Sequence, residues 1–181
     1  PNFAAFINFS SDHLQRHGGL GGYFYAKARL FLENLTDVSV INIDTAEGLF
    51  LFQRLNTIDN KMMAISNKLN IKNYFWAVGR KGSFITEWKK GRQVYSFDLR
   101  NLGNSFHGLW ESVLTVYALA RSLGIAPKSI LTNCSGFVPL AHRNQWVDEI
   151  KGVAFINDSK ATNVDATKHA LKNFKNVHLI L

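Results

Sequence analysis

The sequence predicts an α/β fold: a mostly parallel sheet with an added antiparallel patch. The β-branched run Val38–Ile43 is typical of a central parallel strand covered on both faces. Tyr23–Leu32 has apolar residues at helical spacing, so a helix precedes that strand. The short alternating stretches Tyr74–Val78, Ser83–Trp88 and Gln93–Phe97 follow one another with no helix between them, which indicates antiparallel strands.

The remaining segments before residue 140 continue this pattern. The apolar run Phe3–Phe9 predicts a buried strand, Leu49–Leu55 a helix and Met62–Ile65 a further strand. Residues 89–92, Lys-Lys-Gly-Arg, are typical of a hairpin turn. Two helices are predicted next, one that Gly124 ends and one that begins at Pro127; they cover Trp110–Leu123 and the residues up to Gly136.

A second, smaller region follows a predicted hinge at Gly136–Leu140. Gln145–Ile150 and Val153–Ile156 flank a Lys-Gly pair and predict a hairpin. A helix at Val164–Asn173 and a strand at Val177–Leu181 complete the expected order. We therefore expect a domain boundary between residues 139 and 140.

Composition narrows the class of protein. A chain of 181 residues with 46 % apolar content suits one globular domain, or one domain and a fragment. The net charge is +8, but the cations are mostly scattered and form no basic stripe, so we expect no specific nucleic-acid partner. The one cysteine, Cys134, excludes an internal disulfide and fits a reducing compartment, and no apolar run could span a membrane, so we expect a cytoplasmic protein. Cys134 itself is expected to be a buried structural thiol.

The densest group of reactive side chains is Asn-Asp-Ser-Lys-Ala-Thr-Asn at residues 157–163. It follows a predicted strand and precedes a predicted helix, which is where open α/β sheets bind ligands. Helix capping is the alternative, because Asn, Asp, Ser and Thr are preferred there. One cap needs one such residue, and this segment has six polar ones, so a ligand site is favoured.

Three segments together resemble the Mur ligase family, and most closely its members that add D-glutamate to UDP-N-acetylmuramoyl-L-alanine. The first is Asn157–Thr167, the second Ser11–His17 continued by Tyr23 and Ala26–Arg29, and the third Pro139–Arg143. The resemblance covers most of residues 1–35 and 105–181. The motif at 157–163 differs in the sister ligases.

The resemblance implies a P-loop-type central ATPase domain, in part, over residues 1–139, and the start of a Rossmann-like C-terminal domain over 140–181. It implies an ATP-dependent amide ligase that works through an acyl phosphate in peptidoglycan precursor synthesis. ATP and Mg²⁺ would be its cofactors, and UDP-N-acetylmuramoyl-L-alanine and D-glutamate the small-molecule substrates of a monomer without a membrane partner.

The phosphate-binding loop of the family, Gly-x-x-x-x-Gly-Lys-Ser/Thr, does not occur in the chain. The pairs Gly18-Gly19 and Gly21-Gly22 lack the lysine and hydroxyl of such a loop and are interpreted as a flexible turn. The 181-residue chain alone is therefore expected to be inactive.

By the same resemblance, His13 and Lys27 would hold magnesium, with Lys27 converted to an anionic carbamate. Both would be catalytic, together with Lys160. On residue type alone, His13 is a lone loop histidine. Lys27 lies on the predicted apolar side of its helix, between Tyr23 and Phe31, where the alternative is a buried stem with the ammonium in water.

In the second region, the resemblance assigns Arg143 and Asp158 to the nucleotide, and Lys160 and Thr162 to the carboxylate of the incoming amino acid. Residue types agree, because guanidinium groups bind phosphate and an ammonium suits a small dicarboxylate. Ser159 and His142 are further substrate-binding candidates. Three residues of the motif could equally be helix caps: Ser159, Asn157 and Asn163.

One segment departs from the family pattern. His-Asn-x-x-Asn, in which an asparagine would read adenine, is here His-Gly-Leu-Trp-Glu at residues 107–111. Glu111 stays a nucleotide-binding candidate, but an ionised carboxylate accepts hydrogen bonds and donates none. Trp110 could stack on a base or pack in the core. The alternative function is therefore an inactive nucleotide-binding or interaction module on a Mur ligase scaffold. Asp44 is a weak candidate for ribose or metal, since turns also favour Asp.

Overall fold

The computed structural model describes residues 1–11, 14–33, 35–55, 62–68, 71–102, 109–138, 140–171 and 174–180. The chain forms two compact units, Pro1–Gly136 and Phe137–Leu181.

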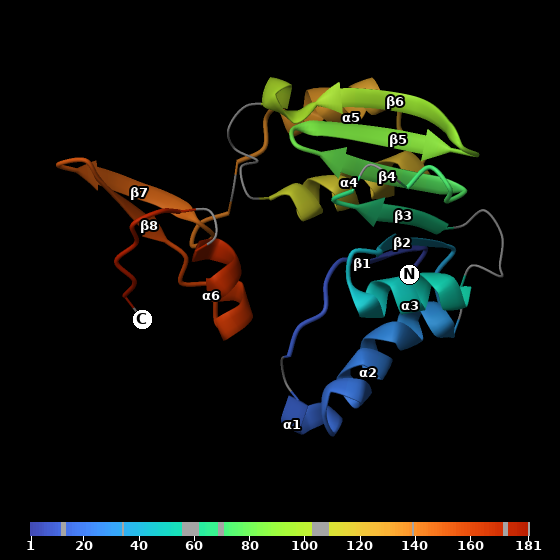
Figure 1. The fold of residues 1–181 in the computed structure, drawn as a ribbon, viewed down its shortest axis with the longest axis horizontal. Helices are drawn as coiled ribbons and strands as arrows, with labels where there is room; N and C mark the ends of the chain where they lie inside the picture. Colours follow the sequence, from blue (N-terminus) through green and yellow to red (C-terminus); the bar gives the residue numbers. More distant parts are fainter. Residues whose placement is uncertain are drawn as a thin grey trace. The chain divides into compact units, whose positions relative to one another are not determined.

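The first unit is built on a six-stranded sheet with the spatial order β1-β2-β3-β4-β5-β6 (Figure 1). The first four strands are parallel neighbours, and β5 and β6 add two antiparallel pairings. The predicted α/β class and its antiparallel patch are thus confirmed. The strands are β1 Phe3–Phe6, β2 Val38–Asn42, β3 Met62–Ser66, β4 Trp76–Lys81, β5 Phe84–Lys89 and β6 Arg92–Asp98.

Strand β1 is shorter than its apolar run. Its ladder with β2 ends at the pair Phe6↔Ile41. The next carbonyl, that of Ile7, accepts a hydrogen bond from the Asn42 side chain at 2.8 Å. A side chain thereby replaces the strand partner, so the prediction of a strand up to Phe9 was wrong.

Helices cover both faces of the sheet. One face carries α2 Leu20–Leu32 and α3 Ala46–Leu55, whose buried residues Phe31 and Leu51 pack with Phe6 and Ile41. The other face carries α4 and α5. The remaining helices of this unit are α1 Leu14–His17, the 3-10 helix η1 Leu99–Leu102, α4 Trp110–Ser122 and α5 Pro127–Cys134. The result is a three-layer α/β/α arrangement with one apolar core on each side of the sheet.

The turn between β5 and β6 forms where the sequence predicted it. Lys90 and Gly91 both have positive φ, 52° and 72°, as a two-residue hairpin turn of the favoured hand requires.

The glycine pairs near residue 20 have a different role from the one predicted. Gly21 and Gly22 lie inside α2, so their interpretation as a flexible turn was wrong. A Cβ on Gly22 would lie 1.9 Å from the carbonyl oxygen of His17. Glycine therefore allows α1 to fold tightly against the start of α2. Gly18 and Gly19, with φ of 67° and 108°, form the bend between the two helices.

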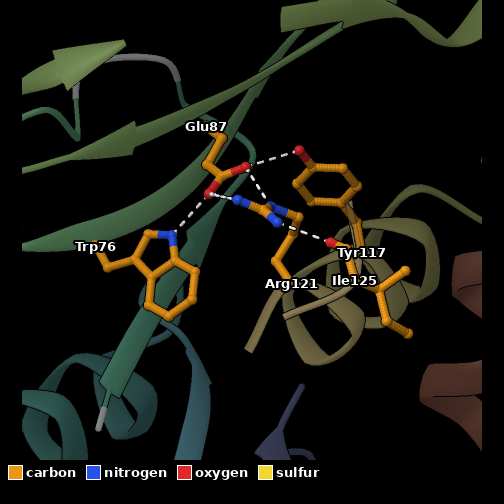
Figure 2. A network of polar contacts seen from close by, with 5 residues as sticks. All are labelled: Trp76, Glu87, Tyr117, Arg121 and Ile125. Carbon is orange, nitrogen blue, oxygen red and sulfur yellow. Dashed lines mark hydrogen bonds and ion pairs between the residues drawn. The ribbon is translucent and has the colours of Figure 1, made fainter. Parts of the chain in front are cut away.

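A buried carboxylate joins α4 to the sheet (Figure 2). Glu87, on β5, accepts hydrogen bonds from Trp76 Nε1 at 2.9 Å, Tyr117 Oη at 2.8 Å and Arg121 Nε at 2.8 Å. Arg121 also donates to the carbonyl of Ile125 at 2.7 Å, which fixes the chain after the helix. Burial acts to raise the pKa of Glu87, but the hydrogen bonds outweigh it, and the pKa lies below its ordinary value. Burial and the same carboxylate raise the pKa of Tyr117.

The thiol of Cys134, at the end of α5, is half-buried and free, and burial raises its pKa. This agrees with a structural role more than with a nucleophile, because the thiolate is the reactive form.

The second unit consists of a two-stranded sheet and one helix. Strands β7 Gln145–Ile150 and β8 Val153–Asn157 form the predicted hairpin, and α6 spans Val164–Leu171. Residues 177–180 pair with neither β7 nor β8 and form no strand, so the prediction of a strand at Val177–Leu181 was wrong for these residues. Position 181 lies outside the described residues.

Among the described residues, no helix is long and apolar enough to cross a membrane.

Candidate functional site

Lys27 lies on the exposed side of α2. The buried positions of this helix are Ala28 and Phe31, so the prediction that Lys27 sits on the apolar side was wrong by one residue, or about 100° of helix rotation. The predicted contact with Tyr23 is present, with Nζ 4.9 Å from the centroid of the ring. The Lys27 side chain is therefore accessible from solvent.

The Tyr23 ring, next to Lys27, contacts residues of two other segments, the one after β1 and helix α1. Its ring centroid lies 5.4 Å from that of Phe9, which follows β1, and 5.1 Å from that of His17 in α1. The segment after β1 and the helix that carries Lys27 are therefore packed against each other. The prediction for His13 lies outside the described residues, as does its neighbour Asp12.

Side chains at the carboxyl ends of the parallel strands form a hydrogen-bonded series. Asn42 donates to the Ile7 carbonyl and accepts from the backbone N–H of Asp44 at 3.0 Å. Asp44 accepts from Ser66 Oγ and from the backbone N–H of Asn67, both at 2.6 Å. Of these residues only Asp44 was singled out from the sequence, as a weak candidate.

Arg80 extends the series to β4 and α4. Its Nε donates to Asn67 Oδ1 at 3.2 Å, and its Nη1 donates to the Gly82 carbonyl at 2.9 Å. The guanidinium carbon lies 4.8 Å from the ring centroid of Trp110, the first residue of α4. Partial burial lowers the pKa of Arg80 from its ordinary value.

Trp110 is half-buried and packs against the core on the α4 side of the sheet, in agreement with the core-packing interpretation. Glu111 follows it with a partly exposed side chain, and its carbonyl accepts from Thr115 Oγ1 at 2.7 Å. His107 and Gly108 lie outside the described residues.

In the second unit, the structure brings the 157–163 motif against residues 142–144. Asn144 donates its backbone N–H to Asp158 Oδ1 at 3.0 Å, and Lys160 donates its own to the His142 carbonyl at 3.2 Å. The Asn157 side chain lies 3.0 Å from Nδ1 of His142. The sequence-predicted residues His142, Asp158 and Lys160 therefore belong to one local cluster.

Backbone geometry supports this cluster. His142 and Asn144 have positive φ values of 64° and 46°, and His142 donates its N–H to Gln145 Oε1 at 2.8 Å. Between these two residues, Arg143 is exposed. The loop therefore turns sharply just before β7 and presents Arg143 to solvent.

Part of the 157–163 motif caps α6, while other residues of the motif have exposed reactive side chains. Asn163 Oδ1 accepts from Ala166 N at 2.8 Å and so caps α6, and Asn157 Oδ1 accepts from Ser159 N at 3.1 Å in a local turn. Lys160, Thr162 and Ser159 are exposed, so their side chains can reach a ligand. The capping alternative thus holds for Asn163 and accounts for only part of the motif.

No group of three or more His, Cys, Asp or Glu side chains that could hold a metal occurs within the described ranges. An open concavity of about 650 Å³ lies elsewhere, lined by Lys72, Asn73, Tyr74, Phe75, Lys90 and Gly91. Its lining includes none of the residues predicted from the sequence.

The fold and these clusters define a class of protein. A family model for the Mur ligase middle domain matches residues 1–105, more than half of the chain, and the chain belongs to the Mur ligase family.

Curated relatives indicate which members of the Mur ligase family the chain resembles. The chain is 43 % identical over 186 residues to the UDP-N-acetylmuramoylalanine--D-glutamate ligase of Cereibacter sphaeroides strain KD131. It is 42 % identical to the ligase of the same name from Roseobacter denitrificans. In both comparisons, 99 % of the chain is covered, but it spans only 39 % of the length of the relative.

Solved structures agree on the fold. MurF from Acinetobacter baumannii matches with a TM-score of 0.69 at 14 % identity, covering 97 % of this chain and 38 % of MurF. A pseudomurein peptide ligase type C from Methanothermus fervidus matches with a TM-score of 0.68 at 13 % identity, covering 96 % of this chain and 41 % of the ligase. The α/β architecture is therefore that of Mur ligases.

Proposed function

We propose that this chain is part of a ligase that adds D-glutamate to UDP-N-acetylmuramoyl-L-alanine, with ATP as the energy source. The observation that carries the proposal is the 43 % identity to a ligase of that name over 99 % of the chain, which includes the 157–163 motif. We further infer a monomer that works on small molecules in the cytoplasm. The assignment of 1–139 and 140–181 to the central and C-terminal domains belongs to the same proposal.

The proposed reaction has two steps. The alanyl carboxylate attacks the terminal phosphorus of ATP, giving an acyl phosphate and ADP. The amine of D-glutamate then attacks the acyl carbon, and the tetrahedral intermediate expels phosphate and leaves an amide, with one amine proton lost to solvent. Positioning and charge stabilisation supply most of the rate enhancement in such steps.

The second unit would bind the incoming amino acid and part of the nucleotide. Lys160 and Thr162 are both exposed, two positions apart on the loop before α6, which suits the two carboxylates of D-glutamate. One carboxylate oxygen of Asp158 accepts a hydrogen bond from Asn144 N, and the other oxygen would bind a ligand such as the nucleotide. Arg143 would contact phosphate, and His142 and Ser159 would border the substrate. Closure about residues 136–143 would bring Lys160 to the acyl phosphate.

The first unit would hold the magnesium side of the site. His13 and Lys27, the latter as a carbamate, would be the ligands, and an oxygen ligand of this kind suits a hard cation. The exposed side chain of Lys27 fits this chemistry, because carbon dioxide must reach its neutral amine, which loses a proton to solvent as the carbamate forms. When bound, Mg²⁺ would neutralise charge on the transferring phosphoryl group. Glu111 would lie on the nucleotide side.

The test is an assay of ADP release by the full-length protein. Release that needs both D-glutamate and UDP-N-acetylmuramoyl-L-alanine is expected. The 181-residue chain alone should release none, because it has no Gly-x-x-x-x-Gly-Lys-Ser/Thr loop. Release by the chain alone would contradict this assignment of parts.

The alternative, an inactive nucleotide-binding or interaction module, is favoured by one observation. Gly108 and Glu111 stand where the family resemblance implies asparagines. Tight ATP binding by the full-length protein, without amide formation for any amino acid, would support this alternative over the ligase.

A further inference from the structure

We propose that Asp44, with Asn42 and Ser66, is a positioning residue that fixes the carboxyl edge of the parallel sheet for the reaction. This inference rests on the proposed function. Ligands of open α/β sheets bind at the carboxyl ends of the strands, so the geometry of this edge sets the geometry of the site.

The series crosses the whole parallel part of the sheet. Asn42 is buried, with 3 % of its surface exposed. Its Nδ2 donates a hydrogen bond to the Ile7 carbonyl, and its Oδ1 accepts one from Asp44 N. Because both groups are used, the amide has one orientation. The segment that leaves β1 toward Phe9 is thereby fixed to the end of β2.

Asp44 makes the next connection, from β2 to β3. Its two carboxylate oxygens take separate donors, Ser66 Oγ and Asn67 N, at 2.6 Å each. Ser66 is buried, at 2 % exposure, and its Oγ also accepts from Lys68 N at 3.0 Å. Hydrogen bonds to a carboxylate are stronger than neutral ones, so the turn after β3 is held in one conformation.

Two glycines allow the strand ends to pack this closely. A Cβ on Gly79 would lie 2.6 Å from the Lys68 carbonyl oxygen, and a Cβ on Gly48 would lie 1.9 Å from the Asn42 carbonyl oxygen. Any larger residue would push the β3 turn away from β4, or α3 away from the end of β2. The backbone at this edge of the sheet can therefore shift very little.

The far end of the series reaches the start of α4. Asn67 accepts from Arg80, and Arg80 stacks on Trp110. In the proposed ligase, the segment after β1 leads to the magnesium ligands, and the start of α4 faces the nucleotide. Asp44 lies between them, so its hydrogen bonds would align the metal with the phosphates.

The experiment compares Asp44→Ala, Asp44→Asn and Ser66→Ala in the full-length protein. Alanine at 44 removes both acceptors, whereas asparagine retains the size and can still pair with Asn67 N and Ser66 Oγ. Asp44 itself is exposed, so neither change empties the core. Thr86→Val is the matched control, since it removes a buried hydroxyl that bonds Ser96 Oγ at 3.0 Å between β5 and β6 of the same sheet.

Asp44→Ala should lower kcat about tenfold and raise the half-saturating Mg²⁺ concentration about tenfold, as loss of an outer-shell partner does. Ser66→Ala should change both in the same direction by less. Asp44→Asn should stay within about threefold of wild type, because positioning needs the hydrogen bonds more than the charge. Thr86→Val should lower Tm and leave kcat and the Mg²⁺ dependence unchanged.

Two results would overturn the inference. If Asp44→Ala matches Thr86→Val in kcat and Mg²⁺ dependence, the series is only structural. If Asp44→Asn is as impaired as Asp44→Ala, the carboxylate charge itself acts on metal or substrate. A wild-type protein that shows no D-glutamate-dependent ADP release would instead overturn the proposed function, and the positioning role with it.

Discussion

The first unit buries its central polar group, whereas the second unit leaves its polar motif at the surface. Glu87 is fully enclosed and is held by residues from β4 and α4. The motif at 157–163 is half-exposed and is held by residues no more than about twenty positions away, such as Asn144. The first arrangement depends on the whole fold, and the second on short-range turns.

The cores differ in the same way. The first unit has two clusters of buried apolar residues, one on each face of its sheet. In the described part of the second unit, Ala170 is the buried apolar residue, and large side chains such as Trp146, Ile150 and Phe155 are exposed. The loop conformation around the 157–163 motif therefore depends on local hydrogen bonds, such as that from Asn144 N to Asp158.

Loss of the buried charge should destabilise the first unit strongly. Glu87→Gln leaves Arg121 without a counter-charge in a site where the arginine side chain is only 16 % exposed. Breaking such a pair costs about 3–5 kcal/mol, measured here as the free energy of unfolding in urea. The exposed pair Arg29–Glu33 on α2 is the control, and Glu33→Gln should leave the unfolding midpoint unchanged. Equal effects of the two changes would remove the special role of burial.

The same carboxylate predicts a pH dependence. Since the pKa of Glu87 is lowered in the folded state, its stabilising effect is complete above its ordinary value of 4.5 and is lost as pH falls through the folded-state value. The difference in unfolding free energy between wild type and Glu87→Gln should therefore shrink as pH decreases below about 4.5. A difference that stays constant from pH 7 to pH 3 would show that the charge of Glu87 is not responsible.

Lys27→Ala in the full-length protein should lower kcat by about 100-fold or more, the size expected when a group that stabilises the transition state is removed. Arg29→Ala, a second exposed cation of α2, serves as the control and should retain wild-type turnover. ADP release measures both. Wild-type turnover in Lys27→Ala would exclude the carbamate.

Asp158→Ala should raise the KM for ATP about tenfold, which corresponds to about 1.4 kcal/mol of binding. It also removes the acceptor of Asn144 N, so the loop before β7 should exchange its amide hydrogens faster. Asp148→Ala, in the exposed strand β7, is the control and should change neither quantity. A normal KM with faster exchange would make Asp158 a purely structural residue.

Lys151→Asn should have the smallest effect. Lys151 and Gly152 have φ of 52° and 77°, and asparagine adopts positive φ more readily than lysine. We expect an increase in stability of the hairpin of about 0.5 kcal/mol, detected as slower amide exchange across β7 and β8. Unchanged exchange would indicate that contacts outside the turn set the stability of this hairpin.

Short-range features of the fold could be predicted from the sequence. The turns at Lys90-Gly91 and Lys151-Gly152, the parallel strand from Val38 and the helix from Trp110 all formed where expected. Each depends on residues within a few positions of one another. His142, Asp158 and Lys160 could also be singled out as candidates, because each lies in one of two short motifs, 139–143 and 157–163.

Features that need strand register could not be predicted. Asp44 meets Ser66 only because β2 and β3 pair in parallel with Asn42 opposite Ile65. Glu87 and Arg121 are 34 positions apart and meet through the packing of α4 on the sheet. The available signal was a charged residue, Glu87, in a short strand segment that also contains Phe84, Ile85 and Trp88. The orientation of Lys27 was missed because one residue of helical phase separates it from the buried Ala28.

The most direct test of the proposed ligase is to identify the product that the full-length protein makes. The protein is incubated with ATP, Mg²⁺, UDP-N-acetylmuramoyl-L-alanine and isotope-labelled D-glutamate, and the nucleotide-linked products are analysed by mass spectrometry. The account predicts one labelled product, heavier by one glutamyl residue, that forms with D-glutamate and not with L-glutamate. ATP binding without any labelled product would contradict it.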